Sequence, residues 1–304
     1  MKLPRPLRPL LSLTARNVKL FLRDKAAVFF SFLSAIIMVA LYFLFIAKLY
    51  SSALAAAGNF GGSAAQTDFL VYSQMMAGVL VINSISLSLG VFGAIAKDFE
   101  GRRVDGFLLT PLRAREIVAA YFLGGFAVSF ALNLLTWAAS AALIGALTGY
   151  WFGAGTFFAA VGILAAASLI GSSIMLLITA LVRSVAALNV VGGVIGTFLG
   201  FLCGIYMPYS NLGKGAEAVG SLLPFTHLTV WLKQTVLNDA LTQLSVPADM
   251  QETILRDYFS AKSVGFCGIA APLWVMLLLS GAFALGCLAA AVFVLKRRIG
   301  GNKK

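Results

Sequence analysis

The sequence offers few side chains that could catalyse a reaction or bind a metal ion. Its single histidine, His227, excludes zinc sites that need two histidines in an H-E-x-x-H pattern. The G-x-S-x-G pattern around a catalytic serine is absent, and so is the G-x-x-x-x-G-K-[ST] loop that binds ATP phosphates. We therefore predict no catalytic residues, no metal site and no cofactor in this chain. Any ATP-driven step would need a separate protein.

Polar chemistry is concentrated instead in one segment, from Lys97 to Glu116. This segment holds nine charged residues, and Phe107, Leu108 and Leu109 form an apolar triplet inside it. A soluble segment seldom exposes three adjacent large apolar side chains without a partner, so we predict a surface that docks onto another protein. The alternative is a solvated loop whose charges pair with one another.

The elements that hold this segment are apolar enough to lie in a membrane. Hydrophobic residues make up 60% of the chain, charged residues 11%, and the mean hydropathy is +0.94. Soluble domains have roughly 25% charged residues. Several apolar runs exceed the ~20 residues that a helix needs to cross a bilayer, which favours helices over a β-barrel. We predict an all-α integral membrane protein with six transmembrane helices, at residues 26–47, 69–96, 117–148, 156–182, 185–207 and 268–295.

Two further elements complete the predicted fold. Residues 10–25 place Arg16, Lys19 and Arg23 at helical spacing, which predicts a basic amphipathic helix in the membrane interface. A secretory signal peptide is the alternative, but the apolar run that follows is longer than the about 7–15 residues of a signal. Residues 208–267 are amphipathic without a run long enough to span, so we expect an outer re-entrant helical element before the last span.

The net charge of +12 is concentrated in a few segments, and their positions indicate how the chain is oriented in the membrane. Eighteen of the 23 Lys and Arg residues fall in the N-terminal segment, the link from Lys97 to Glu116, the turn at Arg183 and the C-terminal tail. The positive-inside rule then places both termini and the link in the cytoplasm of a cell whose plasma (inner) membrane holds the chain. Because this basic charge gathers on one side of the membrane, we expect the lipid membrane and no nucleic acid as a partner.

Within the predicted spans, polar side chains are uncharged. No Asp, Glu, Lys or Arg lies away from the span ends, which disfavours carriers and pumps driven by an ion gradient. Gln74, Asn83 and Ser84 in the second span and Thr197 in the fifth are candidates for a substrate path. The alternative for the polar residues of the second span is hydrogen bonding between helices.

The fifth predicted span carries a repeat of small residues. Gly192, Gly196, Gly200 and Gly204 recur at four-residue steps. A helix face lined with glycines predicts close packing against another helix, either within one subunit or across a dimer interface. The sequence leaves both arrangements open.

The order of these features resembles that of the membrane subunit, or permease, of type-2 exporters among the ATP-binding-cassette (ABC) transporters. The shared layout is a basic interfacial helix, six spans with both ends inside, a long first cytoplasmic link and a re-entrant element before the last span. Two pairs of motifs carry the resemblance. They are Asp98-Phe99-Glu100-Gly101-Arg102-Arg103 with Leu109-Thr110-Pro111-Leu112-Arg113, and Gly204-Ile205-Tyr206-Met207-Pro208 with Leu223-Pro224-Phe225-Thr226.

The resemblance implies a role for the link. In this family a coupling helix in the first cytoplasmic link docks into a cleft of the ATPase subunit. Here that helix would run from Glu100 to Asp105, through Gly101, Arg102 and Arg103, and Phe107, Leu108 and Leu109 would supply its apolar contact. Thr110 and Pro111 suit the start of the next helix, as a cap and a first helical residue.

The resemblance also implies partners and a direction of transport. Two permeases, identical or related, would each bind one ABC ATPase that holds ATP and Mg²⁺. They would move a hydrophobic or amphipathic compound (a drug, a lipid-like molecule or a peptide) outward, and the second and fifth spans would help form the route. The segment 238–262 is longer and more acidic than the family pattern, and it is a lid, a partner site or an insertion. Two other functions are a stand-alone channel or carrier and, with least support, an intramembrane enzyme.

Overall fold

A computed structural model describes residues 7–41, 63–101, 103, 106, 113–182, 184–203, 213–255 and 273–300. Within these residues all regular secondary structure is helical, as the sequence predicts. Five described helices are long and apolar enough to cross a membrane. They are α4 (Ala64–Glu100), α6 (Ala114–Thr148), α7 (Ala154–Leu181), α8 (Val185–Leu202) and, over most of its length, α12 (Leu273–Gly300).

The first predicted span is represented by α2 (Lys25–Leu41). Its 17 described residues fall short of the ~20 that a spanning helix needs. Residues 42–47 of that predicted span lie outside the described part of the chain. The count of six spans therefore stays a prediction, while the described residues form helices, five of which are candidate spans, as expected for an all-α membrane protein.

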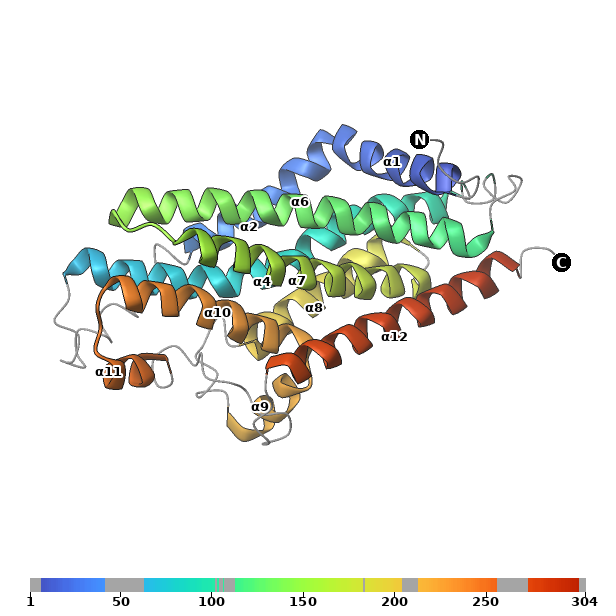
Figure 1. Cartoon of the computed structure of the whole chain (residues 1–304). Helices are drawn as coiled ribbons and strands as arrows, with labels where there is room; N and C mark the ends of the chain where they lie inside the picture. Colours follow the sequence, from blue (N-terminus) through green and yellow to red (C-terminus); the bar gives the residue numbers. More distant parts are fainter. Residues whose placement is uncertain are drawn as a thin grey trace.

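The helix at the centre of the bundle is α4, which packs against α6, α7, α8 and α10 (Figure 1). Its start is fixed by a reciprocal cap, in which Gln66 N donates to Ser63 Oγ and Ser63 N donates to Gln66 Oε1. From Phe69 to Ile85 every residue except Tyr72 is buried. A helix buried on all faces must lie between others, so the buried polar side chains of this span lie inside the bundle and not against lipid.

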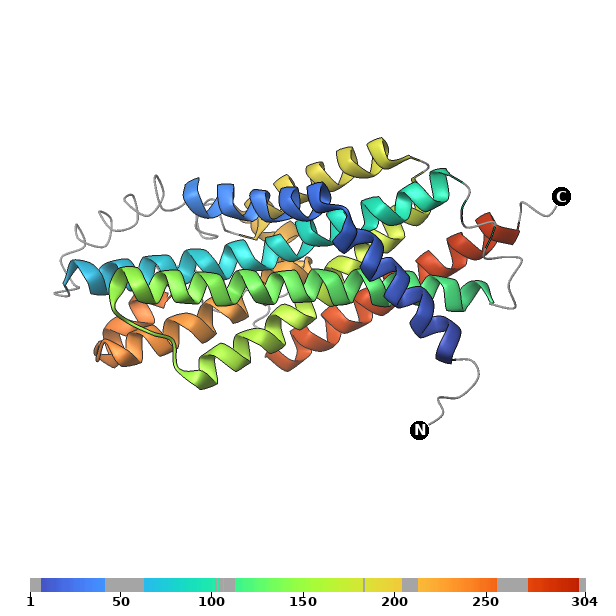
Figure 2. The ribbon, with the colours of Figure 1, turned by 90° about the horizontal axis from the view of Figure 1, so that it is seen from above.

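The amphipathic N-terminal helix is α1 (Leu7–Arg23), which crosses α6 obliquely near the point where α4 ends and α6 begins (Figure 2). We call the end of the bundle that carries Glu100 and Ala114 the link end. The crossing is close because Gly124 lacks a side chain, and a Cβ there would lie 3.0 Å from the Cβ of Asn17. The Asn17 side chain also donates to the Ala120 carbonyl oxygen at 3.3 Å. The predicted helix is therefore present, while its position in a membrane interface stays a prediction.

The predicted outer element contains a longer and more buried helix than expected. α10 (Pro224–Gln243) packs against α4, α7 and α12, and most of its residues are buried. Figure 1 shows α10 and α12 in succession along the bundle, with α12 reaching the link end. Thr226, His227 and Lys233 lower the hydropathy of α10, so its sequence does not resemble a buried helix. Two short helices, α9 (Gly213–Ser221) and α11 (Ala248–Thr253), flank it.

The helix boundaries differ from the predicted ones at the link end. The predicted link began at Lys97, but α4 continues to Glu100, where the Gly101 N–H still donates to the Lys97 carbonyl oxygen at 2.9 Å. At its other end α6 begins at Ala114, because the Glu116 carboxylate accepts from the Arg113 N–H at 2.9 Å. Charged residues at a membrane surface remain helical when the helix extends into water, so hydropathy alone ended the helix of the second span too early and began the helix of the third span too late.

The fifth predicted span corresponds to α8. α8 stops at Leu202, where the Cys203 N–H bonds back to the Leu199 carbonyl oxygen at 2.8 Å. The predicted end was residue 207, and residues 204–207 lie outside the described part of the chain. At 18 residues, α8 is the shortest of the five candidate spans.

Candidate functional site

A buried carboxylate, Asp98, lies in the last turn of α4. It is 2% exposed, and its Oδ2 accepts hydrogen bonds from Arg16 Nη1 at 3.0 Å and from the Tyr121 hydroxyl at 3.2 Å. Arg103, inside the link, has its Nη1 3.7 Å from Asp98 Oδ1. A carboxylate taken out of water needs such partners. Asp98 therefore joins the link to α1 and to α6 in one junction.

Two further contacts join the end of α4 to other helices. Lys97 Nζ lies 3.7 Å from Asp24 Oδ2, and the other oxygen of Asp24 accepts from the Ala27 N–H at 3.0 Å in the first turn of α2. Glu100 Oε2 accepts from the Val185 N–H at 3.4 Å, in the first turn of α8. Together with Asp98, these residues connect the last turn of α4 to four helices, α1, α2, α6 and α8. We call this set of contacts the α4 junction.

The residues predicted to couple to an ATPase are only partly described. Glu100 ends α4, Gly101 caps it, and Arg103 contacts Asp98 from an exposed position. The other predicted coupling residues lie outside the described part of the chain; these are Arg102, Phe107, Leu108, Leu109, Thr110 and Pro111. Their role in docking stays a prediction.

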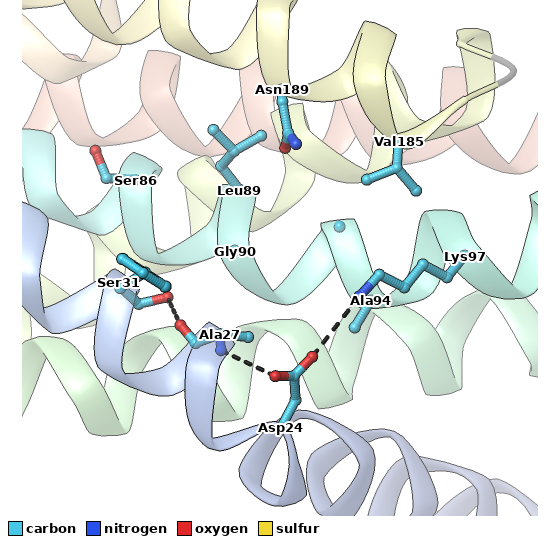
Figure 3. A pocket seen from close by; sticks show the side chains of 12 residues that line it. Asp24, Ala27, Ser31, Ser86, Leu89, Gly90, Ala94, Lys97, Val185 and Asn189 are labelled. Carbon is cyan, nitrogen blue, oxygen red and sulfur yellow. Dashed lines mark hydrogen bonds and ion pairs between the residues drawn. The ribbon is translucent and has the colours of Figure 1, made fainter.

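A cavity of about 420 Å³ opens between α2, α4 and α8, beside the α4 junction (Figure 3). We call it the α2–α4–α8 pocket. Figure 3 shows Asn189 and Val185 reaching from α8 towards α4, with Asp24 and Lys97 at the link end. The lining combines apolar, uncharged polar and charged side chains: Asp24, Ala27, Phe30, Ser31, Ser86, Leu89, Gly90, Gly93, Ala94, Lys97, Val185 and Asn189.

The predicted path residues of α4 are buried in the bundle and do not line this pocket. Asn83 Nδ2 donates to Thr136 Oγ1 of α6 at 3.5 Å, and the Ser84 hydroxyl donates to the Val81 carbonyl oxygen at 2.6 Å. Gln74 is 2% exposed, and its Oε1 has no partner among the described residues. Thr197 of α8 is exposed. The structure thus does not bring these four residues together, and their role in a path stays a prediction.

Further polar contacts join the three central helices α4, α6 and α7. Ser88 Oγ donates to Ser129 Oγ of α6 at 3.1 Å and lies 3.3 Å from Ser172 Oγ of α7. A side chain at Gly171 would meet this layer, because its Cβ would lie 3.3 Å from Ser88 Oγ. Such hydrogen bonds between membrane helices are typically worth below ~2 kcal/mol each.

The glycines of α8 divide between two faces. Gly192 faces α4, where a Cβ would lie 2.4 Å from Leu89 Cδ1, and Gly200 is also buried. A Cβ at Gly193 or Gly196 would meet nothing within 4 Å. The predicted repeat therefore serves packing within the protomer at Gly192, whereas Gly204 lies outside the described residues. The face around Gly193 is exposed and apolar; its large side chains are Val190, Val194, Phe198 and Phe201.

Several residues of the site were missed by reasoning from sequence. Asp98 and Arg16 are separated by 82 residues, and nothing in their local patterns pairs them. Asn189 is one polar residue in an apolar span, and its sequence context does not indicate that it lines a pocket. Two charged or titratable side chains of α10 are also buried: Lys233, and His227, whose Nε2 lies 2.7 Å from the Ser221 carbonyl oxygen. A charged residue in a helix of low hydropathy gives no signal of burial.

Comparison with known protein families identifies a match that covers most of the chain. A family model described as ABC-2 type transporter matches residues 8–237. The matched range runs from the first turn of α1 into α10, so it contains the α4 junction, the α2–α4–α8 pocket and α8. No curated protein matches the chain.

Proposed function

This chain belongs to the ABC-2 type transporter family, and we propose on that basis that it is the permease subunit of an ATP-driven exporter. A separate ABC ATPase, which binds ATP and Mg²⁺, docks on the link between α4 and α6. The permease moves a hydrophobic or amphipathic compound outward across the plasma membrane. Both termini and the link end face the cytoplasm, as the concentration of Lys and Arg there favours.

The observation that carries this proposal is the α4 junction. A motor that pulls or pushes on the link acts first on the last turn of α4, which is joined to α1 by Arg16, to α6 by Tyr121 and to α8 by Val185. These contacts are polar and directional, so a displacement of the link is passed on to these helices rather than absorbed by side-chain rearrangement. Membership of the family implies a separate ATPase that acts as the motor. The α4 junction provides the contacts through which a displacement of the link reaches the other helices.

A second copy of the permease completes the exporter. The exposed face of α8 combines large side chains, such as Val190 and Phe198, with Gly193 and Thr197. Small residues between large ones allow two helices to approach closely in a membrane, where apolar contact with lipid alone gives no driving force. We therefore place the contact between the two permeases, or part of it, on this face of α8.

A matched pair of glycine variants tests the dimer contact. Gly193→Leu adds a side chain where the protomer leaves open space, so it is expected to shift the complex from dimer to monomer without lowering the thermal midpoint of the protomer. Gly192→Leu pushes against Leu89 of α4 and is expected to cost about 1–3 kcal/mol of protomer stability. Native mass spectrometry measures the fraction of dimer, and a thermal shift assay measures the stability of the protomer. A Gly193→Leu chain that remains dimeric removes α8 from the interface.

The ATPase partnership is tested by purification from the native membrane. The chain is isolated in a mild detergent, its partners are identified by mass spectrometry, and ATP hydrolysis is measured on the eluate. The proposal expects an ABC ATPase at one copy per permease and hydrolysis that transported compounds stimulate. An eluate without a nucleotide-binding protein, in a detergent that preserves such complexes, overturns the proposal in favour of a channel or carrier that needs no ATP.

A further inference from the structure

The α2–α4–α8 pocket has the polarity of a site for one amphipathic molecule. Its volume of about 420 Å³ falls in the range of small-molecule sites. Phe30, Leu89 and Val185 supply apolar surface, and the charged residues Asp24 and Lys97 lie together at the link end. A molecule with an apolar chain and a charged head matches this division, whereas a wholly apolar molecule leaves the charged end of the pocket unused.

Two uncharged polar side chains in the pocket are available for a ligand. Among the described residues, the side chains of Ser86 of α4 and Asn189 of α8 make no hydrogen bond, although both line the cavity. Figure 3 shows Asn189 reaching down into the space above α4. Polar groups within an apolar bilayer are costly without partners, so the oxygen atoms of a bound headgroup would satisfy them.

The balance of charge at the open end favours an anionic head. Two carboxylates near the end of α4 already accept backbone N–H groups, Asp24 from Ala27 and Glu100 from Val185. The Lys97 side chain is 60% exposed, and its 3.7 Å contact with Asp24 is a partly solvated ion pair of the kind that contributes little and rearranges readily. Arg23 and Lys25, beside Asp24, are also exposed.

A glycine of α4 keeps the cavity open. Gly93 is buried in the protein, yet a Cβ there would meet nothing within 4 Å, because the residue faces the pocket. One turn earlier the space is filled, since a Cβ at Gly90 would lie 2.6 Å from Ser31 Oγ of α2. A large side chain at position 93 would therefore fill the pocket without displacing the helices.

We propose that this pocket binds a phosphate-bearing amphiphile from the cytoplasmic leaflet and is the entry site for the exported compound. Lys97 pairs with the phosphate, and Asn189 and Ser86, which lie progressively farther from Lys97 along the axis of α4, hydrogen-bond to oxygens farther along the molecule. The chain lies over Phe30 and Leu89. The role in entry rests on the proposed function, whereas binding itself requires no ATPase.

The test is photolabelling of the purified chain in nanodiscs. The probe is a phosphatidic acid with a photoactivatable group in its acyl chain, and labelled peptides are mapped by mass spectrometry. We expect labels on α2 and α8, and a loss of about tenfold in Gly93→Leu and in Lys97→Gln, which corresponds to about 1.4 kcal/mol of binding free energy. Gly286→Leu on α12, where a Cβ also meets nothing within 4 Å, is the matched control and should label as the unchanged chain does.

Three comparisons decide the outcome. Equal labelling of Gly93→Leu and Gly286→Leu overturns the site, and so does equal labelling by a probe whose headgroup is trimethylammonium. If an excess of phosphatidylglycerol displaces the phosphatidic acid probe, the site is supported and its ligand is bulk phospholipid. If the probe still labels the site in this excess, the site is supported and its ligand is a scarcer amphiphile with a phosphate headgroup. If the chain purifies without an ATPase but is still labelled at this site, the proposed binding site is supported and only the proposed function is overturned.

Discussion

Replacing Asp98 by asparagine is expected to lower transport about tenfold while the complex continues to hydrolyse ATP. The substitution keeps the size of the side chain but removes its charge, so the contacts with Arg16 and Arg103 lose their electrostatic attraction. Hydrogen bonds to a charged group contribute about 1.5–3 kcal/mol, and a coupling free energy of about 1.4 kcal/mol is a factor of ten. The link is then displaced without moving α1. The measurement compares ATP hydrolysis with substrate movement in proteoliposomes.

Two further variants separate coupling from folding. Asp239→Asn removes a carboxylate that accepts from the Gly153 N–H at 2.9 Å, outside the α4 junction, and is expected to leave the ratio of transport to hydrolysis unchanged. Arg16→Gln removes the partner of Asp98 on α1 and should reproduce the loss that comes from α1. Because Asp98→Asn already removes the charge that Arg16 contacts, the double variant should be no worse than Asp98→Asn alone. Additive losses, or an equal loss in Asp239→Asn, would refute the junction.

The triple change of Phe107, Leu108 and Leu109 to serine is expected to abolish binding of the ATPase. Burying one large apolar side chain contributes about 1.5–3 kcal/mol, so the loss of three lowers affinity by more than about a thousandfold. Serine keeps the link soluble, and the transmembrane sequence is untouched. Binding is measured by co-purification and by titration of the ATPase against the permease in nanodiscs.

The matched control replaces apolar residues that are exposed elsewhere. Val219 and Leu222, 52% and 54% exposed in the segment before α10, are changed to serine. This control should bind the ATPase as the unchanged chain does. If the triple variant also retains the ATPase, the docking surface lies elsewhere, and the link is a solvated loop.

Hydropathy and charge predicted most of the architecture. The spans that correspond to α4, α6 and α7 were identified because apolar runs of this length have few other uses, and α1 was identified from the helical spacing of Arg16, Lys19 and Arg23. The family resemblance drawn from the link and its flanking motifs is confirmed by the family match. These features are local, so a single sequence contains them.

Features that depend on distant contacts were not predictable from the sequence. Asp98 looked like one charge among nine, and its contacts with Arg16 of α1 and Tyr121 of α6 join residues that are far apart in the sequence. The burial of α10 depends on neighbours that cover its Thr, His and Lys side chains. The pocket at Gly93 is a property of three helices, and no pattern in any one of them encodes it.

The central claim is that the link between α4 and α6 contacts a separate ATPase, and site-specific crosslinking measures this most directly. A photoreactive amino acid is placed at Leu108, and a second chain carries it at Val219 as the control. After irradiation of native membranes, the account predicts a crosslink from position 108 to an ABC ATPase and none from position 219. A crosslink from both positions, or from neither in membranes where the ATPase is abundant, would contradict it.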